Sequence, residues 1–399
     1  MLAGFNLDKV YQYLLIGLAF IFPLTVFGGN LIVVVICILW IFSGKYKYKY
    51  QKIISSNVML ASILFFCMHV IGLIWTEDMK WGFHVVHKMW YFLLFYPILY
   101  TIVKKDNIKY YVTAFLIAIS LTEIVSYLVW FEVIPPFKNA TVINPTPFMS
   151  HISYNPILAF AIYLTSYEIF FNKRLIKPKL FLYSFFTVTM TINMFITGGR
   201  AGQSMFFAMV AILIFQVLNH QKIKSFIAIS LILPIIFFIA YYYSDLFHTR
   251  FNETIINIIN FSENKNTSVG QRISYAINSW DIIINNPLFG VGTGDFTLEN
   301  AKQNLVNSPD VQMTTNPHNM YLLIMVQNGI VGLVTMLSIF FYQIKLALNS
   351  KNKFMKDAGL TLPLLFLLIM FSDAYLLGHY TTLMFVFFSS FLHNNFEKD

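Results

Sequence analysis

Charged residues are scarce in this sequence. Asp, Glu, Lys and Arg make up 11% of its 399 residues, whereas hydrophobic residues make up 57% and aromatic residues 18%. Soluble domains carry about 25% charged residues. The composition therefore excludes an ordinary soluble globular domain and predicts a membrane protein.

Cysteine and cofactor motifs are also rare or missing. The only two cysteines, Cys37 and Cys67, lie inside apolar stretches, which is typical of small buried hydrophobes rather than of a disulfide or a metal site. The sequence has neither a Walker-type glycine-rich loop nor a dinucleotide-binding fingerprint. We therefore expect no cofactor, and chemistry that uses neither ATP nor a cytoplasmic nucleotide-sugar.

Long apolar stretches are what the sequence has instead. A membrane helix needs about 17–25 mostly apolar residues, and about twelve stretches come near this length. They lie near 11–27, 30–43, 57–75, 86–103, 110–130, 155–171, 180–197, 201–218, 224–243, 318–344, 358–376 and 380–393. We therefore predict an all-α polytopic membrane protein.

Basic residues predict the orientation of these spans, because lysine and arginine stay on the cytoplasmic side during insertion. They cluster after every even-numbered span, at 45–52, 104–109, 173–179, 222–224 and 345–356. Both termini are then expected in the cytoplasm of a bacterium, with the protein in its inner membrane. The net charge of +9 is explained by this topology, and nucleic acid is not needed as a partner.

The same topology divides the chain into three segments. Residues 1–243 hold nine expected membrane helices, residues 244–317 form a long periplasmic loop, and residues 318–399 hold the last three helices. Chemistry is expected in the periplasmic loop and at its borders. The loop has no cluster of Asp, Glu and His at metal-ligand spacing, so we expect a metal-independent protein.

The periplasmic loop contains two recognisable local patterns. From Thr267 an apolar stripe recurs at helical spacing, which predicts an amphipathic helix on the membrane surface or across the mouth of the bundle. Arg272 borders this stripe, which consists of Val269, Ile273, Ile277, Trp280 and Ile284. Further on, Gly290, Gly292 and Gly294 are typical of a tightly turned backbone that allows close approach.

A histidine stands where the loop meets the tenth span. We expect Asn316 to cap that helix and Pro317 to occupy its first position. His318 would then lie at the positive end of the helix dipole, which favours the neutral ring that a general base needs. A histidine at a membrane boundary is by default an interfacial or hydrogen-bonded residue, so the position alone favours that interpretation over a catalytic role.

The ordered segments TGGRAGQ (197–203), QRISYAINSW (271–280), NPLFGVGTGDF (286–296) and NPHNMYLLIMVQNGIVGL (316–333) resemble the O-antigen ligase/polymerase superfamily. The last two segments carry most of this resemblance, and the span number and long outer loop agree with a GT-C-like fold. Two positions depart from the family pattern. Gln327 stands where an acidic residue is frequent, and Gly199 stands where a serine is frequent.

The resemblance implies a glycosyltransferase of the O-antigen ligase type. A glycan (O-antigen) would move from undecaprenyl diphosphate to a sugar hydroxyl of lipid A-core, a step of lipopolysaccharide biosynthesis on the periplasmic side. His318 would act as general base. Arg200 and Arg272 would bind the diphosphate, because guanidinium forks bind phosphate oxygens bidentately. The alternative interpretation of Arg200 is a snorkelling topology anchor.

Further substrate contacts are expected around these three residues. Lys88, at the outer end of the fourth span, could add a phosphate contact or anchor the helix at the interface, and Asp373 could orient His318 or pair with an arginine. The other expected contacts are His151, Asn316, Asn319, Tyr321, Gly290, Gly292 and Gly294. Glu123, inside the fifth span, needs a partner that the sequence does not name.

Two other classes of function remain open from the sequence. A glycan polymerase or a protein O-oligosaccharyltransferase of the same superfamily would use similar groups with a different acceptor. A twelve-helix transporter would have the same number of spans, but the two halves of the chain show no internal repeat.

Overall fold

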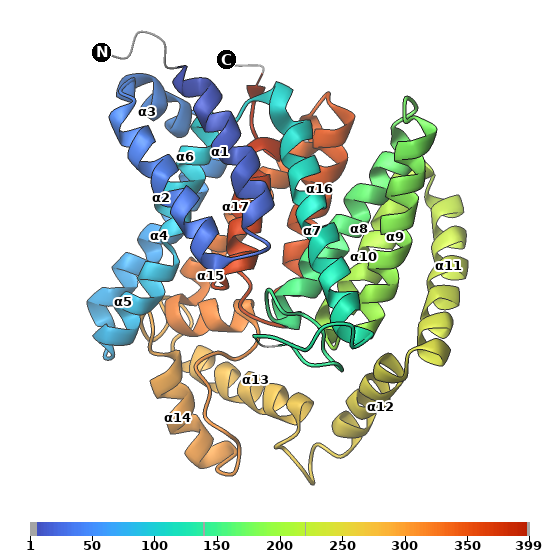
Figure 1. Cartoon of the computed structure of the whole chain (residues 1–399). Coiled ribbons are helices and arrows are strands. Elements are labelled where there is room, and N and C mark those ends of the chain that lie inside the picture. The colour runs from blue at the N-terminus through green and yellow to red at the C-terminus, as the bar shows by residue number, and fades with distance from the viewer. Residues whose placement is uncertain (1–5, 139, 220, 397–399) are drawn as a thin grey trace. The chain divides into compact units, whose positions relative to one another are not determined.

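The computed structural model describes residues 6–138, 140–219 and 221–396, which form helices and no strands (Figure 1). Seven of these helices are long and apolar enough to cross a membrane, or eight if the bent pair α2 and α3 counts as one span. Helices satisfy all backbone polar groups internally, so they are the form that apolar stretches take in lipid. The predicted all-α polytopic fold is confirmed, whereas the number of about twelve spans stays a prediction.

The chain forms two compact units, each built from two stretches of sequence. Unit 1 comprises the stretch up to Ile36 and Lys104–Asn252, and unit 2 comprises Cys37–Val103 and the stretch from Glu253 onward. Two helices run from one unit into the other, α2 (Val26–Phe42) and α12 (Asp245–Ile259). This division follows contacts, while the division at residues 243 and 317 follows expected membrane topology and stays a prediction.

Unit 1 is a bundle in which α8 packs against both α9 and α10, and α1 packs against α7. Figure 1 shows α8, α9 and α10 side by side in green. The outermost helix, α11, leaves most of its apolar side chains exposed, as expected of a surface in lipid. The helices are α1 (Leu7–Ile21), the 3-10 turn η3 (Lys105–Asn107), α7 (Ile108–Trp130), α8 (His151–Phe171), α9 (Lys177–Ile196), α10 (Arg200–Val217) and α11 (Lys222–Tyr243).

Unit 2 is centred on the long helix α15, which packs against α4, α13 and α16. Its other close pairs are α13 with α14 and α6 with α17. The helices are α3 (Tyr46–Ile54), α4 (Asn57–Ile71), the 3-10 turn η1 (Gly72–Trp75), α5 (Met79–Lys88), the π-helical turn η2 (Tyr91–Phe95), α6 (Tyr96–Ile102), α13 (Ser268–Asn285), α14 (Phe296–Asn307), α15 (Met320–Asn349), α16 (Lys353–Ile369) and α17 (His379–Leu392).

The amphipathic helix predicted after Thr267 is confirmed as α13. The Thr267 side chain caps it by accepting a hydrogen bond from the Gly270 N–H. The apolar stripe points outward, since Ile277, Trp280 and Ile284 are exposed, while the opposite face is buried in unit 2. An exposed apolar stripe is what a helix at the membrane surface presents to lipid.

Helix α15 is broken at Gly329, and the glycine-rich turn fills the break. Gly329 has φ 61° and ψ −161°, so the helical hydrogen bonds around it are interrupted. The Val291 N–H donates to the Val326 carbonyl at 2.8 Å, and the Ile330 N–H donates to the Pro287 carbonyl at 2.9 Å. The turn therefore replaces the hydrogen bonds that the helix loses, which satisfies backbone groups in the core of the unit.

Both sides of this contact require glycine. A Cβ on Gly290 would lie 2.4 Å from the Val326 carbonyl oxygen, and one on Gly329 would lie 2.3 Å from the Leu288 backbone. Gly290, Gly292 and Gly294 all have positive φ, which side chains disfavour. The tightly turned backbone predicted from the three glycines is confirmed, and it fixes the segment that follows α13 against α15.

Candidate active site

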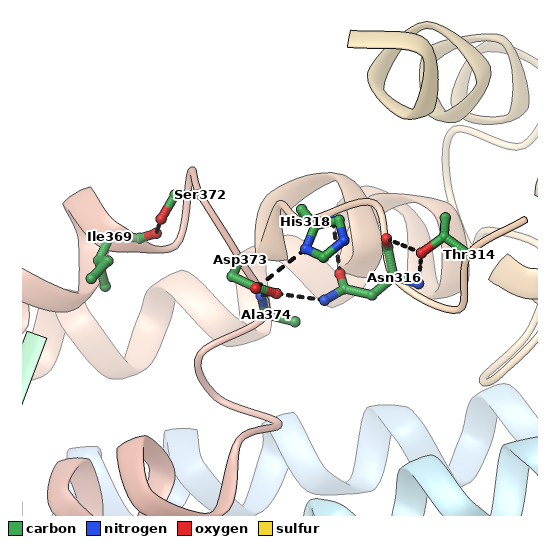
Figure 2. A network of polar contacts seen from close by, with 7 residues as sticks. All are labelled: Thr314, Asn316, His318, Ile369, Ser372, Asp373 and Ala374. Atoms are coloured by element: carbon green, nitrogen blue, oxygen red, sulfur yellow. Dashed lines mark hydrogen bonds and ion pairs between the residues drawn. The ribbon is translucent and has the colours of Figure 1, made fainter. Parts of the chain in front are cut away.

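The candidate site of unit 2 is a polar network around His318, drawn in Figure 2. His318 Nδ1 lies 3.3 Å from Oδ2 of Asp373, in the turn between α16 and α17. The Asn316 amide donates to the other carboxylate oxygen, Oδ1, at 2.5 Å. The same Asn316 side chain accepts from the His318 N–H at 2.9 Å. The Asn316 side chain therefore hydrogen-bonds both the backbone N–H of His318 and the carboxylate of Asp373.

The start of α15 differs from the prediction. The helix begins at Met320, and its cap is Asn319, whose side chain accepts hydrogen bonds from the Tyr321 and Leu322 N–H groups. The expectation that Asn316 caps the helix and that His318 lies in its first turn is therefore wrong. His318 instead precedes the cap, in a left-handed conformation with φ 52°. Its ring is fixed by the carboxylate of Asp373 rather than by a place within the helix.

The charge of Asp373 determines how the histidine is oriented. Burial opposes its ionisation, but hydrogen bonds from His318, the Ala374 N–H and Asn316 outweigh burial and lower the pKa of Asp373. An ionised carboxylate only accepts hydrogen bonds, so Nδ1 of the neutral His318 ring must carry the proton. Nε2 is then the basic nitrogen, and no described residue donates to it.

Helix α13 supplies two more residues to this site. The ring of Tyr275 lies 6.3 Å from that of His318, centroid to centroid. Arg272 lies one turn earlier on α13 and is half-buried. Burial raises the pKa of Tyr375, next but one to Asp373, and the positive charge of Arg272 acts in the opposite direction. Arg272 therefore lies within electrostatic range of the Asp373 turn.

The Arg272 guanidinium has no hydrogen bond or ion pair with any residue in the described part of the chain. A half-buried guanidinium without a carboxylate is suited to an anionic ligand. Of the three residues predicted to be catalytic, the structure thus brings Arg272 and His318 together in unit 2. Tyr275 and Tyr375 are additions that the sequence did not single out, although Tyr275 stands in the QRISYAINSW segment.

The other predicted contact residues of unit 2 differ in what they contact. The Tyr321 hydroxyl donates to the Leu367 carbonyl, and its ring lies 4.6 Å from that of Phe371, which joins α15 to α16. Lys88 ends α5, and the described residues offer its side chain no hydrogen bond or ion pair. Substrate contacts by Lys88, Tyr321 and the three glycines stay predictions.

Unit 1 contains a second candidate site around the turn between α9 and α10. Arg200 begins α10, and its N–H donates to the Gly198 carbonyl at 3.1 Å. Asn144 joins this turn to α8, because its side chain accepts from the Gly198 N–H and contacts Nδ1 of His151. A Cβ on Gly199 would lie 2.5 Å from the Asn155 side chain. Glycine at this position, where serine is frequent in the family, therefore allows the turn to pack closely against Asn155.

Arg250 belongs to the same site, and sequence analysis missed it. The Ser244 hydroxyl donates to the Phe195 carbonyl at 2.7 Å, and the ring of Phe247 lies 5.2 Å from that of Phe195. These contacts tie the start of α12 to the end of α9, and Arg250 follows Phe247 by three residues, on the same face. Burial and the charges of Arg250 and Arg200 together lower the pKa of His151.

The site of unit 1 therefore gathers two arginines around a histidine that tends to stay neutral. Two guanidinium groups whose charges both act on one histidine are suited to a multiply charged anion such as a diphosphate. Glu123, the buried acidic residue of α7, lies in the same unit. Glu123 is thus part of the polar interior of unit 1.

No metal centre emerges from the residues that the structure describes. Among residues 6–138, 140–219 and 221–396, no group of three or more His, Cys, Asp and Glu side chains could hold a metal ion. Metal independence stays a prediction, to be tested with a chelator.

The chain was compared with known protein families. Residues 185–337 match a family described as O-antigen ligase. The matched range includes α10 with Arg200, α12 with Arg250, α13 with Arg272, the glycine-rich turn and His318. No curated protein matches the chain significantly.

Proposed function

Since residues 185–337 match a family described as O-antigen ligase, we propose that this chain belongs to the O-antigen ligase superfamily and transfers a glycan from undecaprenyl diphosphate to a sugar hydroxyl of lipid A-core. Ligase- or polymerase-type chemistry follows from the family, and the lipid A-core acceptor is our proposal. The reaction takes place on the periplasmic side of the inner membrane. The distribution of basic residues supports this side, because it puts the loop that contains Arg272 and His318 outside.

The contact between His318 and Asp373 is the observation that carries the proposal. The acceptor hydroxyl oxygen forms a bond to the anomeric carbon of the donor glycan, and its proton passes to Nε2 of His318. Asp373 holds the proton on Nδ1, so Nε2 has the lone pair that this step needs. As the imidazolium forms, the adjacent carboxylate stabilises its charge.

The arginines act on the leaving group. The bond between the anomeric carbon and the diphosphate oxygen breaks, and undecaprenyl diphosphate departs with the electron pair. Fixed positive charge stabilises the negative charge that develops there. We propose that Arg272, in unit 2, contacts this diphosphate. Separately, we propose that Arg200 and Arg250, in unit 1, bind a phosphate group of the lipid-linked donor. The half-buried Arg272 without a carboxylate partner supports this role.

The proposal is tested by reconstituting the purified protein with a lipid-linked glycan and rough lipopolysaccharide, with and without a chelator. We expect glycan on the lipid A-core and free undecaprenyl diphosphate in equal amounts, unaffected by chelator. If the lipid-linked glycan became longer while lipid A-core stayed unmodified, the protein would be a polymerase and not a ligase. Glycan attached to protein would indicate the protein-modifying branch, and transfer abolished by the chelator would contradict metal independence.

A further inference from the structure

A cavity of about 480 Å³ lies in unit 2, at the end of α15 that is far from the candidate active site. His318 stands just before the first residue of this helix, whereas Lys345 and Asn349, near its last residue, line the cavity. The part of α15 that follows the break at Gly329, residues 330–349, alone rises roughly 30 Å at about 1.5 Å per residue. The cavity is therefore separate from the site that the proposed reaction uses.

Two helix faces with the same spacing form the walls of this cavity. On each helix the lining residues follow the i, i+3, i+4, i+7 pattern of a single face. The face of α3 is formed by Tyr48, Gln51, Lys52 and Ser55, and that of α15 by Tyr342, Lys345, Leu346 and Asn349. The two faces offer ammonium, hydroxyl and amide groups instead of the apolar contacts that usually join packed helices.

The cavity is lined by positive charge and hydrogen-bond donors without any acidic residue. Lys52 and Lys345 contribute ammonium groups, and within the described residues no hydrogen bond or ion pair engages that of Lys345. The first residues of α4 also line it, with Ser56 as the cap and Asn57 as the first helical residue. The positive end of that helix dipole adds to the attraction for an anion.

The bend before α3 fixes this wall. Helix α3 turns by 115° from α2, and Lys49 holds the turn through hydrogen bonds to the Trp40 carbonyl and the Ser43 hydroxyl. Lys49 is therefore buried and engaged, and Lys52, one turn later, lines the cavity. A short basic helix bent sharply away from a span is placed at the level of lipid headgroups in a membrane.

We propose that this cavity binds a phosphate group, carried either by an anionic phospholipid headgroup or by a phosphorylated solute. Two lysines, several hydroxyl and amide donors and the absence of acidic lining residues match a phosphate monoanion or diester. Basic pockets between membrane helices on the cytoplasmic side bind anionic headgroups. The cavity lies at an end of unit 2 that carries the basic clusters 45–52 and 345–356.

Lipid binding to the full-length protein tests this proposal. The protein is purified in nanodiscs of phosphatidylethanolamine with a small fraction of phosphatidylglycerol, and retained phosphatidylglycerol is measured by native mass spectrometry. Each of Lys52→Gln and Lys345→Gln should weaken binding about fivefold, since a lysine near an anionic headgroup contributes about that factor. The matched control is Lys351→Gln, which removes an exposed lysine just beyond α15 that does not line the cavity.

The second arm uses sn-glycerol 3-phosphate and inorganic phosphate, with detergent-solubilised protein and isothermal titration calorimetry. Binding of phosphatidylglycerol that depends on Lys52 and Lys345, without binding of the solutes, assigns the site to lipid. Binding of the solutes with the same lysine dependence assigns it to a phosphorylated solute. Equal losses in all three lysine variants, or no binding in either arm, would overturn the proposal. His318→Ala should retain the binding, which separates this result from the fate of the proposed reaction.

Discussion

His318 and Asp373 are 55 positions apart in the sequence, and their side chains meet with Nδ1 3.3 Å from Oδ2. Asn316 and the Ala374 N–H engage the other carboxylate oxygen, so Asp373 has little freedom to turn away. A buried carboxylate held in this way fixes one tautomer of the imidazole ring. The relationship turns a histidine at a membrane boundary into a candidate general base.

Asp373→Asn is expected to lower the transfer rate about 10²-fold or more, because general-base catalysis contributes about 10²–10⁴-fold and the amide permits the wrong tautomer. The apparent KM for the lipid-linked donor should change little, since Asp373 faces the histidine. Single-turnover transfer in the reconstituted system measures both quantities. The control is Asp310→Asn, which changes an exposed aspartate in the segment between α14 and α15. Equal rates for Asp373→Asn and the control would contradict the orienting role.

Gly329→Ala is expected to destabilise unit 2 through two effects. A left-handed backbone costs a side-chain residue about 1–2 kcal/mol, and forced overpacking adds about 1–3 kcal/mol. Gly44 supplies the matched control, because it has φ +65° with nothing within 4 Å of an added Cβ. Gly44→Ala should therefore show the backbone effect alone. Thermal unfolding in detergent should show a clearly larger loss of stability for Gly329→Ala than for Gly44→Ala. Similar losses of stability would contradict the close contact between the glycine-rich turn and α15.

Much of the secondary structure follows from local pattern. The periodicity after Thr267 predicts α13 and its cap correctly, because capping and amphipathicity are properties of adjacent residues. The segment NPHN contains two asparagines, and the prediction took the first, Asn316, as the cap of α15. The structure uses Asn319, while the Asn316 side chain accepts from the His318 N–H and donates to Asp373. Which asparagine caps the helix depends on contacts with a residue distant in sequence, and a local pattern does not predict such contacts.

The break in α15 and the place of Arg250 are also determined over long distances. Gly329 stands in an apolar stretch that is typical of an uninterrupted span, and the turn at 287–292 decides that the helix opens there. Arg250 has no motif around it, and its place depends on the contacts of Ser244 and Phe247 with Phe195. Both features therefore depend on packing between segments that are far apart in the sequence, which the local sequence pattern does not predict.

Arg250→Gln is expected to raise the apparent KM for the lipid-linked donor about tenfold, since a charge-assisted hydrogen bond contributes about 1.5–3 kcal/mol. Arg250→Lys should recover part of the loss, because it keeps the charge but not the bidentate geometry. Initial transfer rates at varied donor concentration measure the effect. Arg174→Gln, which removes an exposed arginine between α8 and α9, is the control. An unchanged KM in Arg250→Gln would exclude a contact with the diphosphate.

Acid should destabilise unit 1 through His151. Its pKa in the folded protein is lowered by burial and by Arg250 and Arg200, so the unfolded chain binds the proton more readily. Stability is then complete above the ordinary histidine pKa of about 6.5 and falls as the pH drops below it. Apparent melting temperatures at about pH 7.5 and about pH 5.5 should differ less in His151→Gln than in the wild type. The exposed His87, replaced by Gln, should leave the difference unchanged.

The most direct test of the proposed function is single-turnover transfer by His318→Ala, with donor binding measured in parallel. We expect transfer to fall by about 10²–10⁴-fold, the contribution of a general base, while the lipid-linked donor still binds through the arginines. A steeper dependence of the residual rate on hydroxide concentration should accompany the loss. Transfer by His318→Ala at the wild-type rate, with donor binding intact, would contradict the assignment of His318 as the base.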